Sequence, residues 1–275
     1  MEHSSGDVIC LTKGSSVFLC NPATGELVAL PAPRRNDDHR FGFGYVPSLG
    51  QFKVARFDDP LSYEVFTVGT DRSWREIRRP HCRVYEGGGI PFLNGALHLL
   101  PSSNCTRQLR ISPPFDENGT AQYEDELFVS NGIAAFDLEL ETWRMVPLPS
   151  FDCDEKRELR RYRVMFLREL NGLLCLGVSF PYKLHLRLLM DYESGRWVKE
   201  YSISFSSLRH AGDWPPPAPV AIMDDGRILL ESSELGLVFY DRRDERFTEI
   251  EGSRGWRASL YVENILLSLR EPFTT

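Results

Sequence analysis

The stretch IAAFDLELETWRMVPLP, residues 133–149, holds a short apolar run, an acidic turn and a tryptophan within seventeen positions. Its apolar and aromatic residues suit a pleated strand, and its polar residues suit a turn, so it predicts two β-strands joined by a short loop. The same pattern occurs four more times, as VFLCNPATGELVALP from Val17, YEVFTVGTDRSWREI from Tyr63, LRLLMDYESGRWVKEY from Leu186 and LVFYDRRDERFTEI from Leu237. The chain is therefore built on a repeated hairpin.

The spacing of the copies predicts a propeller. In four of them a polar residue stands six positions before a large apolar one, in the pairs Asn21 and Leu27, Asp137 and Trp143, Asp191 and Trp197, and Asp241 and Phe247. The second copy is one residue shorter, from Gly69 to Trp74. The five large apolar residues lie 47, 69, 54 and 50 positions apart. A recurrence of roughly 40 to 50 residues in strand-rich sequence is typical of propeller blades. The longest interval contains residues 101–127, whose loop composition predicts an insertion within one blade.

Second hairpins are needed because a blade has about four strands. Asn-Gly or Asp-Gly turns between apolar runs predict them at residues 91–100, 168–177 and 221–231, and a longer turn predicts one at residues 43–57. The N-terminus has too few strands for a blade, so we expect ASLYVENILLSL, residues 258–269, to complete the first blade and close the ring. The prediction is a single all-β domain, residues 1–275. It is a closed β-propeller of five four-stranded blades at about 8–30 plus 258–269, 41–79, 91–149, 162–203 and 219–250.

Composition excludes several classes of protein. The chain has no run of 18 apolar residues, and MEHSSGDVICL lacks the basic start and long apolar stretch of a signal peptide. We therefore expect a soluble protein of the cytoplasm or nucleus with no membrane partner. The net charge of -7 makes nucleic acid an unlikely partner, because a general nucleic-acid binder needs a basic footprint. Six scattered cysteines without a Cys-x-x-Cys pair predict free thiols and no zinc site.

No catalytic motif is present in the sequence. It contains neither Gly-x-Ser-x-Gly nor His-Glu-x-x-His, and EGGGIPF, residues 86–92, lacks the Gly-Lys-Ser/Thr of a phosphate loop. His98, in the apolar run ALHLL, is expected to be a hydrogen-bonded core histidine. The expected innermost strands FGFGYV, IPFL, RVMFL and PVAIM hold no internal carboxylate, which a propeller glycoside hydrolase would need. We expect no enzyme activity, no catalytic or metal-binding residues and no cofactor.

Several motifs together resemble a known family. Asn-Pro-Ala-Thr-Gly at residues 21–25, Leu-Pro at residues 30–31 and Gly-Phe-Gly-Tyr at residues 42–45 are its most specific features. With the hairpins they resemble the F-box-associated domain of plant F-box proteins, a kelch-like all-β module, in order from Val8 to Leu269. In that family an F-box docks on a Skp1-type adaptor of a cullin ubiquitin ligase, and the propeller selects the substrate. The resemblance thus implies a substrate-recognition role.

The F-box itself is expected to be absent, because only seven residues precede Val8. A Skp1-type adaptor and a cullin are therefore expected partners only if an F-box precedes this chain. Three functions remain open. The leading one is a protein-interaction module like the substrate receptor of an SCF-type ligase; the second is an F-box-less adaptor or competitor that recruits no ligase; the weakest is a propeller glycoside hydrolase.

The expected target is a protein, and the expected binding surface follows from loop length. In an up-and-down blade the short hairpin turns share one face, and the longer segments 31–40, 79–89, 101–127, 150–162 and 205–219 open on the other. Long loops on a rigid scaffold commonly carry function. Trp74, Trp143 and Trp197 are instead expected to pack between blades. The candidate partner-binding residues are Arg34, Arg35, Arg78, Arg79, His81, Arg160, Arg161, Arg209, His210 and Trp214.

Overall fold

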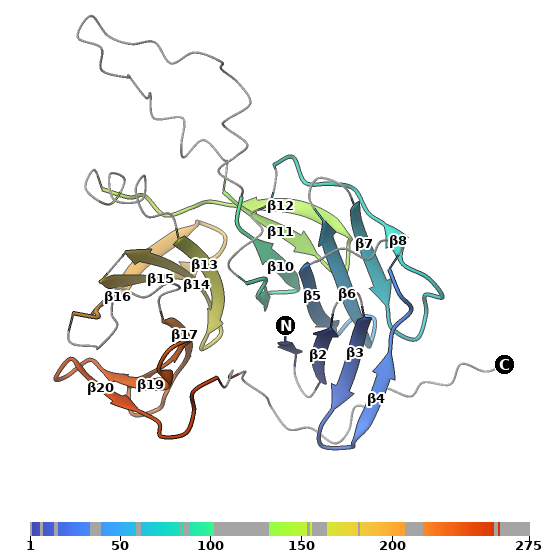
Figure 1. The fold of residues 1–275 in the computed structure, drawn as a ribbon. Helices are drawn as coiled ribbons and strands as arrows, with labels where there is room; N and C mark the ends of the chain where they lie inside the picture. Colours follow the sequence, from blue (N-terminus) through green and yellow to red (C-terminus); the bar gives the residue numbers. More distant parts are fainter. Residues whose placement is uncertain are drawn as a thin grey trace, which may run out of the picture.

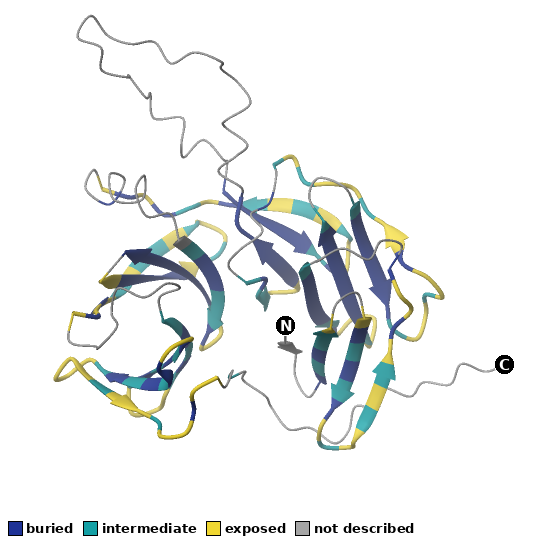
Figure 2. Ribbon diagram, viewed as in Figure 1, coloured by how far each residue is buried: buried dark blue, intermediate teal, exposed yellow. Residues whose placement is uncertain are grey.

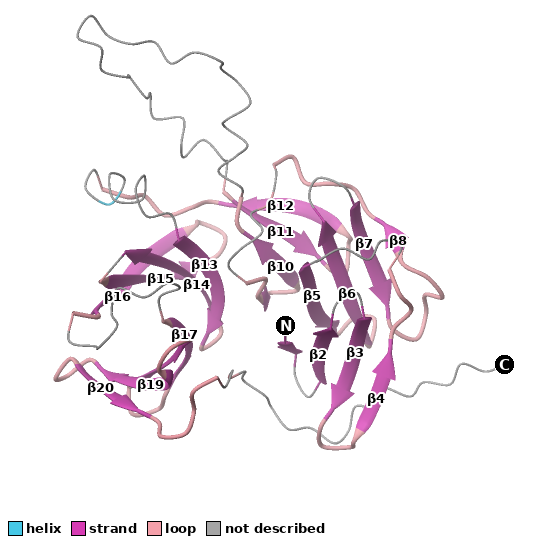
Figure 3. Ribbon diagram, in the orientation of Figure 1, coloured by secondary structure: helices cyan, strands magenta, loops and turns pink. Residues whose placement is uncertain are grey.

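The chain folds into five antiparallel sheets set around a ring (Figure 1). The structure, a computed structural model, describes residues 2–5, 8–13, 16–33, 40–58, 62–82, 84, 89–101, 132–152, 155, 164–180, 182–206, 217–255 and 258. Each sheet has four strands in chain order, so every blade is an up-and-down meander (Figure 3). The predicted all-β propeller of five four-stranded blades is confirmed.

The first two blades come from the N-terminal part of the chain. Blade 1 consists of β1 (Glu2–Ser5), β2 (Val8–Lys13), β3 (Ser16–Asn21) and β4 (Glu26–Ala29). Blade 2 consists of β5 (Arg40–Val46), β6 (Gln51–Asp58), β7 (Ser62–Thr67) and β8 (Arg75–Glu76). The pairing of β1 with β2 gives blade 1 four strands from the N-terminal segment. The segment 258–269, expected to complete this blade, lies outside the described residues apart from Ala258.

The other three blades follow at the predicted spacing. Blade 3 consists of β9 (Phe92–Leu93), β10 (Ala96–Leu99), β11 (Ile133–Asp137) and β12 (Thr142–Val146). Blade 4 consists of β13 (Val164–Leu170), β14 (Leu173–Phe180), β15 (Lys183–Asp191) and β16 (Arg196–Ser204). Blade 5 consists of β17 (Ala218–Ile222), β18 (Ile228–Ser232), β19 (Gly236–Asp241) and β20 (Arg246–Glu249). The long interval in the repeat falls between β10 and β11, within blade 3, as predicted.

The core lies between neighbouring sheets, in four buried clusters that join blades 1 and 2, blades 2 and 3, blades 3 and 4, and blades 4 and 5 (Figure 2). Alternation along β15 shows how one strand serves two interfaces. Leu184 and Leu186 belong to the cluster shared with Ile228 and Leu230 of blade 5. Leu189 belongs to the opposite cluster, with side chains of blade 3. A fully buried aliphatic side chain of this kind contributes about 1.5 to 3 kcal/mol.

Close approach of the inner strands needs a residue without a side chain. A Cβ at Gly44 of β5 would collide with the Phe92 ring of β9. Glycine at this position therefore lets blades 2 and 3 converge toward the ring centre.

The turns between third and fourth strands share one conformation, which explains the six-residue spacing in the sequence. In blades 1, 3, 4 and 5 the side-chain oxygen of an Asn or Asp accepts hydrogen bonds from backbone N–H groups two or three residues later. The fourth residue after it has positive φ, at Gly25 (71°), Glu141 (53°), Gly195 (64°) and Glu245 (54°). The pattern therefore encodes a turn closed by its own side chain.

Three tryptophans join successive blades, as predicted. Each donates its indole N–H to a backbone carbonyl on the link that leaves the preceding blade. The bonds run from Trp74 to Pro31 (2.7 Å), from Trp143 to Arg78 (2.7 Å) and from Trp197 to Pro147 (2.8 Å). Phe247 holds the same position in blade 5 and packs on Phe205, with ring centroids 6.0 Å apart. Leu27, its counterpart in blade 1, is 62% exposed.

No helix among the described residues is both long and apolar enough to cross a membrane.

Candidate functional site

The blade topology gives the ring two faces with different connections. Turns from first to second and from third to fourth strands leave one end of each sheet, which we call the short-turn face. Turns from second to third strands and the links between blades leave the other end, which we call the long-loop face. Of the expected binding residues, Arg78, Arg79 and His81 stand on the link after blade 2, which belongs to the long-loop face.

Only part of the expected site can be placed. Arg34, Arg35, Arg160, Arg161, Arg209, His210 and Trp214 lie outside the described residues. Arg78, Arg79 and His81 are described, and all three are exposed on the link after blade 2. The structure therefore brings these three together in one short segment and leaves their relation to the other seven untested.

The main chain of that link is held at two points. The N–H of Ile77 donates to the carbonyl of Tyr63 on β7 at 2.8 Å. The carbonyl of Arg78 accepts the indole N–H of Trp143 on β12, in the bond described above. Trp143 is in turn packed edge-on against Phe57 and Tyr63 of blade 2. The side chains of Arg78 and Arg79 therefore project from a backbone fixed by blades 2 and 3.

The next link round the ring, after blade 3, carries a buried carboxylate. Glu155 Oε1 accepts hydrogen bonds from Arg187 Nη2, from Lys199 Nζ at 3.1 Å and from His185 Nδ1 at 3.2 Å. Burial alone would raise the pKa of Glu155, but the hydrogen bonds from Arg187 and Lys199 outweigh burial and lower the pKa to about 2. Glu155 therefore stays ionised at neutral pH and ties its link to β15 and β16.

The side chains that bind Glu155 differ in hydrogen bonding and in charge. The Arg187 guanidinium stacks on the Phe151 ring, 4.9 Å from its centroid. Its Nη1 is buried without a hydrogen-bond partner in the part of the chain that the structure describes. Burial, aided by the charge of Lys199, lowers the pKa of His185 to about 4, so this histidine is neutral at pH 7. The sequence pattern did not predict this cluster, because its members come from separate strands and a link.

His98 is a hydrogen-bonded core histidine, as predicted. It is fully buried, and its Nε2 hydrogen-bonds to the hydroxyl of Tyr192 in blade 4. Burial lowers the pKa of His98 to about 4, so the ring is neutral at pH 7. Its role is to join blades 3 and 4 through a neutral polar contact.

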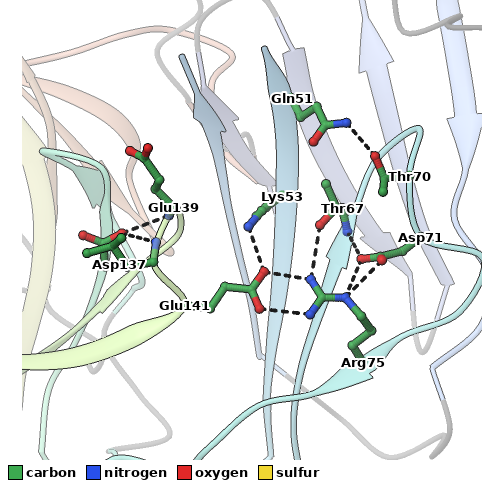
Figure 4. Close-up of polar contacts among 10 residues, drawn as sticks. Gln51, Lys53, Thr67, Thr70, Asp71, Arg75, Asp137, Glu139 and Glu141 are labelled. Atoms are coloured by element: carbon green, nitrogen blue, oxygen red, sulfur yellow. Dashed lines mark hydrogen bonds and ion pairs between the residues drawn. The ribbon is translucent and has the colours of Figure 1, made fainter. Parts of the chain in front are cut away.

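The short-turn face carries an ionic network between blades 2 and 3 (Figure 4). Glu141, in the turn between β11 and β12, accepts hydrogen bonds from Lys53 Nζ at 2.8 Å and from Arg75 Nη1 and Nη2 at 3.0 and 2.7 Å. Arg75 also pairs with Asp71 at 3.0 Å. The hydrogen bond from Arg75, followed by that from Lys53, lowers the pKa of Glu141 to about 2 despite partial burial. The bonds from Lys53 and Arg75 of blade 2 to Glu141 of blade 3 thus hold two neighbouring blades together.

A polar groove of about 330 Å³ lies on the outer rim between blades 4 and 5. Its walls are residues 199–202 of β16 with Tyr240, Arg242 and Glu245. Arg242 lies over the Tyr201 ring, 5.3 Å from its centroid, and pairs with Glu200 at 3.0 Å. A bulge in β16 beside Tyr201 shifts the alternation of side chains there. The bulge lies in the part of β16 that lines the groove, and the sequence pattern did not predict it.

One expectation about the ring centre needs correction. The innermost strand of blade 4 extends beyond the predicted RVMFL to Leu170, so it includes the carboxylate of Glu169. Glu169 accepts a hydrogen bond from the backbone N–H of Gly172 in the following turn. Among the inner strands whose side chains are described, it is the single carboxylate. No group of three His, Cys, Asp or Glu residues suited to a metal ion comes together within the described ranges.

Comparison with known proteins gives the family context. Residues 2–112 match the model of the F-box associated beta propeller domain. An F-box/LRR-repeat/kelch-repeat protein of Arabidopsis thaliana is 23% identical, over 98% of this chain and 72% of its own length. An F-box protein of the same plant is 25% identical over 90% of this chain and 64% of its own length. A putative F-box protein, also from Arabidopsis thaliana, is 26% identical over 71% of this chain and 49% of its own length.

These matches span between about half and three quarters of the relatives' lengths. The family match covers blades 1 and 2 and the start of blade 3, and the alignment to the first relative extends over nearly the whole chain. The resemblance read from the sequence is therefore confirmed: this chain is similar to plant F-box proteins and, over residues 2–112, to the F-box associated beta propeller domain.

Proposed function

We propose that this chain is a protein-interaction module that recognises a target protein through its long-loop face. The observation that carries the proposal is the match to the F-box associated beta propeller domain, together with similarity to F-box proteins along the chain. In the family such a propeller selects the substrate of an SCF-type ubiquitin ligase. We propose the same role for this one, as the substrate-recognition part of a ligase receptor.

The geometry of the ring supports a recognition role. The tryptophan bonds at Trp143 and Trp197 hold the links after blades 2 and 3 at their carbonyls. A surface whose backbone is already ordered loses little conformational entropy when a partner binds. The exposed side chains of Arg78, Arg79 and His81 stand on one of these links. The long-loop face therefore combines a rigid base with accessible polar groups.

The experiment that tests this function is purification of the endogenous protein, at its native length, from its native tissue. Co-purification of a target together with a Skp1-type adaptor and a cullin would support the role of ligase receptor. A target without these two partners would favour the second candidate, an adaptor or competitor that recruits no ligase. Recovery of no protein partner would contradict both.

A deletion tests separately whether the target binds through the long-loop face. Removing residues 104–122 from the predicted insertion should abolish capture of the target identified above. The thermal unfolding midpoint of the deletion variant should stay close to that of the unaltered chain. If capture survives, the target does not use this insertion; if the variant fails to fold, the placement of the insertion outside the ring core is wrong.

A glycoside hydrolase remains the weakest candidate. Its mechanism needs two carboxylates about 5 to 10 Å apart. Among the inner strands whose side chains are described, Glu169 is the one carboxylate, and it accepts a hydrogen bond from the turn that follows. Among the residues that the structure describes, no pair of carboxylates favours this function.

A further inference from the structure

We infer that the link after blade 2, residues 77–82, is a docking site for an acidic segment of the target protein. This segment is called the basic link below. The inference rests on the proposed function, because it names the chemistry of the partner that the long-loop face would take.

The basic link has cationic groups and no acid. Its sequence is IRRPHC, and Arg78, Arg79 and His81 are all exposed. Within the described residues, the side chains of Arg78 and His81 make no hydrogen bond or ion pair. The acid nearest to it along the sequence is Glu76, on β8. Arginine suits carboxylate partners because its guanidinium offers paired donors in a planar array.

The backbone of the basic link is held by both neighbouring blades. On blade 2, the carbonyl of Tyr63 accepts a hydrogen bond from the N–H of Ile77. On blade 3, the indole N–H of Trp143 donates to the carbonyl of Arg78. The main chain of this link is therefore ordered before any partner arrives, so binding orders little more than the arginine side chains. This is the property that separates the link from an ordinary solvated loop.

The short-turn face offers the opposite charge. The described turns on that face are residues 22–25, 47–50, 68–74, 94–95, 138–141, 171–172, 192–195, 223–227 and 242–245, and they hold eight Asp or Glu against four Arg. The whole chain also carries a net charge of -7. An acidic partner is therefore repelled from the short-turn face and from the molecule at large, and is attracted locally by the basic link.

The adjoining link shows that carboxylate binding already occurs on this face. There Glu155 is bound by Arg187, Lys199 and His185. That site is filled by the chain itself. On the basic link the corresponding donors, Arg78 and His81, are left to solvent and to a partner.

The test uses the full chain and a fluorescein-labelled peptide made of glutamate and glycine, with a peptide of glutamine and glycine as its neutral counterpart. The test variant is R78E/R79E. The matched control is R242E/R243E, which reverses two consecutive arginines on the short-turn face. Fluorescence anisotropy measures binding at low and at high salt.

We expect the unaltered chain to bind the acidic peptide and not the neutral one, with affinity that falls as salt rises. R78E/R79E should weaken binding by about tenfold or more, and R242E/R243E should leave it unchanged. Equal losses in the two variants, or equal binding of the two peptides, would overturn the inference. Thermal unfolding of each variant guards against misfolding, and R78Q/R79Q repeats the test without introducing negative charge.

A capture experiment with the same variant distinguishes failure of the basic link from failure of the proposed function. A target captured equally well by the unaltered chain and by R78E/R79E would overturn the basic link as its docking site while leaving the interaction module in place. Failure to recover any target would instead count against the module itself.

Discussion

Glu141 and Glu245 occupy the same turn position in blades 3 and 5, yet replacing each with glycine should change stability in opposite directions. Both have positive φ, 53° and 54°, where blades 1 and 4 carry Gly25 and Gly195. A non-glycine residue in this conformation costs roughly 1 kcal/mol. A glycine relieves this strain, but it also gives the unfolded chain more conformational freedom, which lowers stability. The net effect of glycine at this position, without any lost side-chain contact, should be a gain of about 0.5 kcal/mol in the free energy of unfolding.

The two side chains differ in what they hold. Glu245 makes no hydrogen bond or ion pair with the described residues. Glu141 binds Arg75 through both carboxylate oxygens, and one of these also accepts from Lys53, whose side chain is 5% exposed. Removing one partner of a buried pair costs about 3 to 5 kcal/mol. The side chain of Glu141 is 22% exposed and Arg75 keeps Asp71 as a partner, so we expect a loss of about 2 kcal/mol.

The net expectation is that Glu245→Gly gains about 0.5 kcal/mol and that Glu141→Gly loses about 1.5 kcal/mol. In a chain of this size, a difference of about 2 kcal/mol corresponds to several degrees in the midpoint of thermal unfolding. Circular dichroism during thermal and urea unfolding measures both variants under one set of conditions.

A double-mutant cycle isolates the buried cation. In a Lys53→Met background, Glu141→Gly should cost much less, because no buried ammonium is left unpaired. If both glycine variants gain stability equally, the network contributes nothing and the reasoning from burial is wrong. If both lose stability, the strain assigned to positive φ is wrong.

Three further predictions concern other parts of the ring. Trp143→Phe keeps an aromatic ring but removes the indole donor, and it should lower the free energy of unfolding by about 1 kcal/mol in urea titrations, whereas an unchanged value would show that this bond adds nothing. The pKa of His98 lies near 4 in the folded chain and near 6.5 when unfolded, so the stability that His98 contributes above pH 6.5 should be lost as pH falls toward 4. The loss should be on the order of 3 kcal/mol and smaller in His98→Gln; urea midpoints equally dependent on pH in both proteins would contradict this. Burial raises the pKa of Cys10 and Cys175 to about 12, so at pH 8 both should resist iodoacetamide while the partly exposed Cys82 reacts, as peptide mass spectrometry would show; early labelling of Cys10 would contradict the burial.

Structural elements that are formed by interactions between residues close in sequence were predicted well. The hairpins that contain β11 and β12, or β15 and β16, were predicted because the turn is closed by an Asp whose bonds reach only two or three residues ahead. Elements without such a signal were missed or cut short. The strand β1 has the polar sequence EHSS, which shows no apolar alternation, and β13 runs past the predicted segment as far as Leu170. Pairing with a neighbouring strand, more than residue preference, forms such strands.

The sequence likewise predicted part of the candidate site and missed another part. Loop length together with residue type marked Arg78, Arg79 and His81 as polar groups on a link between blades, and the structure shows them exposed there. Sequence did not show that the carbonyl of Arg78 meets the indole of Trp143, which lies 65 positions away.

The repeat, the number of blades and the chemistry of the turns were determined by the sequence itself, because each depends on residues a few positions apart and on their spacing along the chain. Tertiary structure alone decided which charges meet. Lys53 and Glu141 are separated by 88 positions, and Glu155 and Lys199 by 44. Such pairs form only when separate blades pack side by side, since the position of one blade relative to the next is set by the shape of their whole interface rather than by any short stretch of sequence.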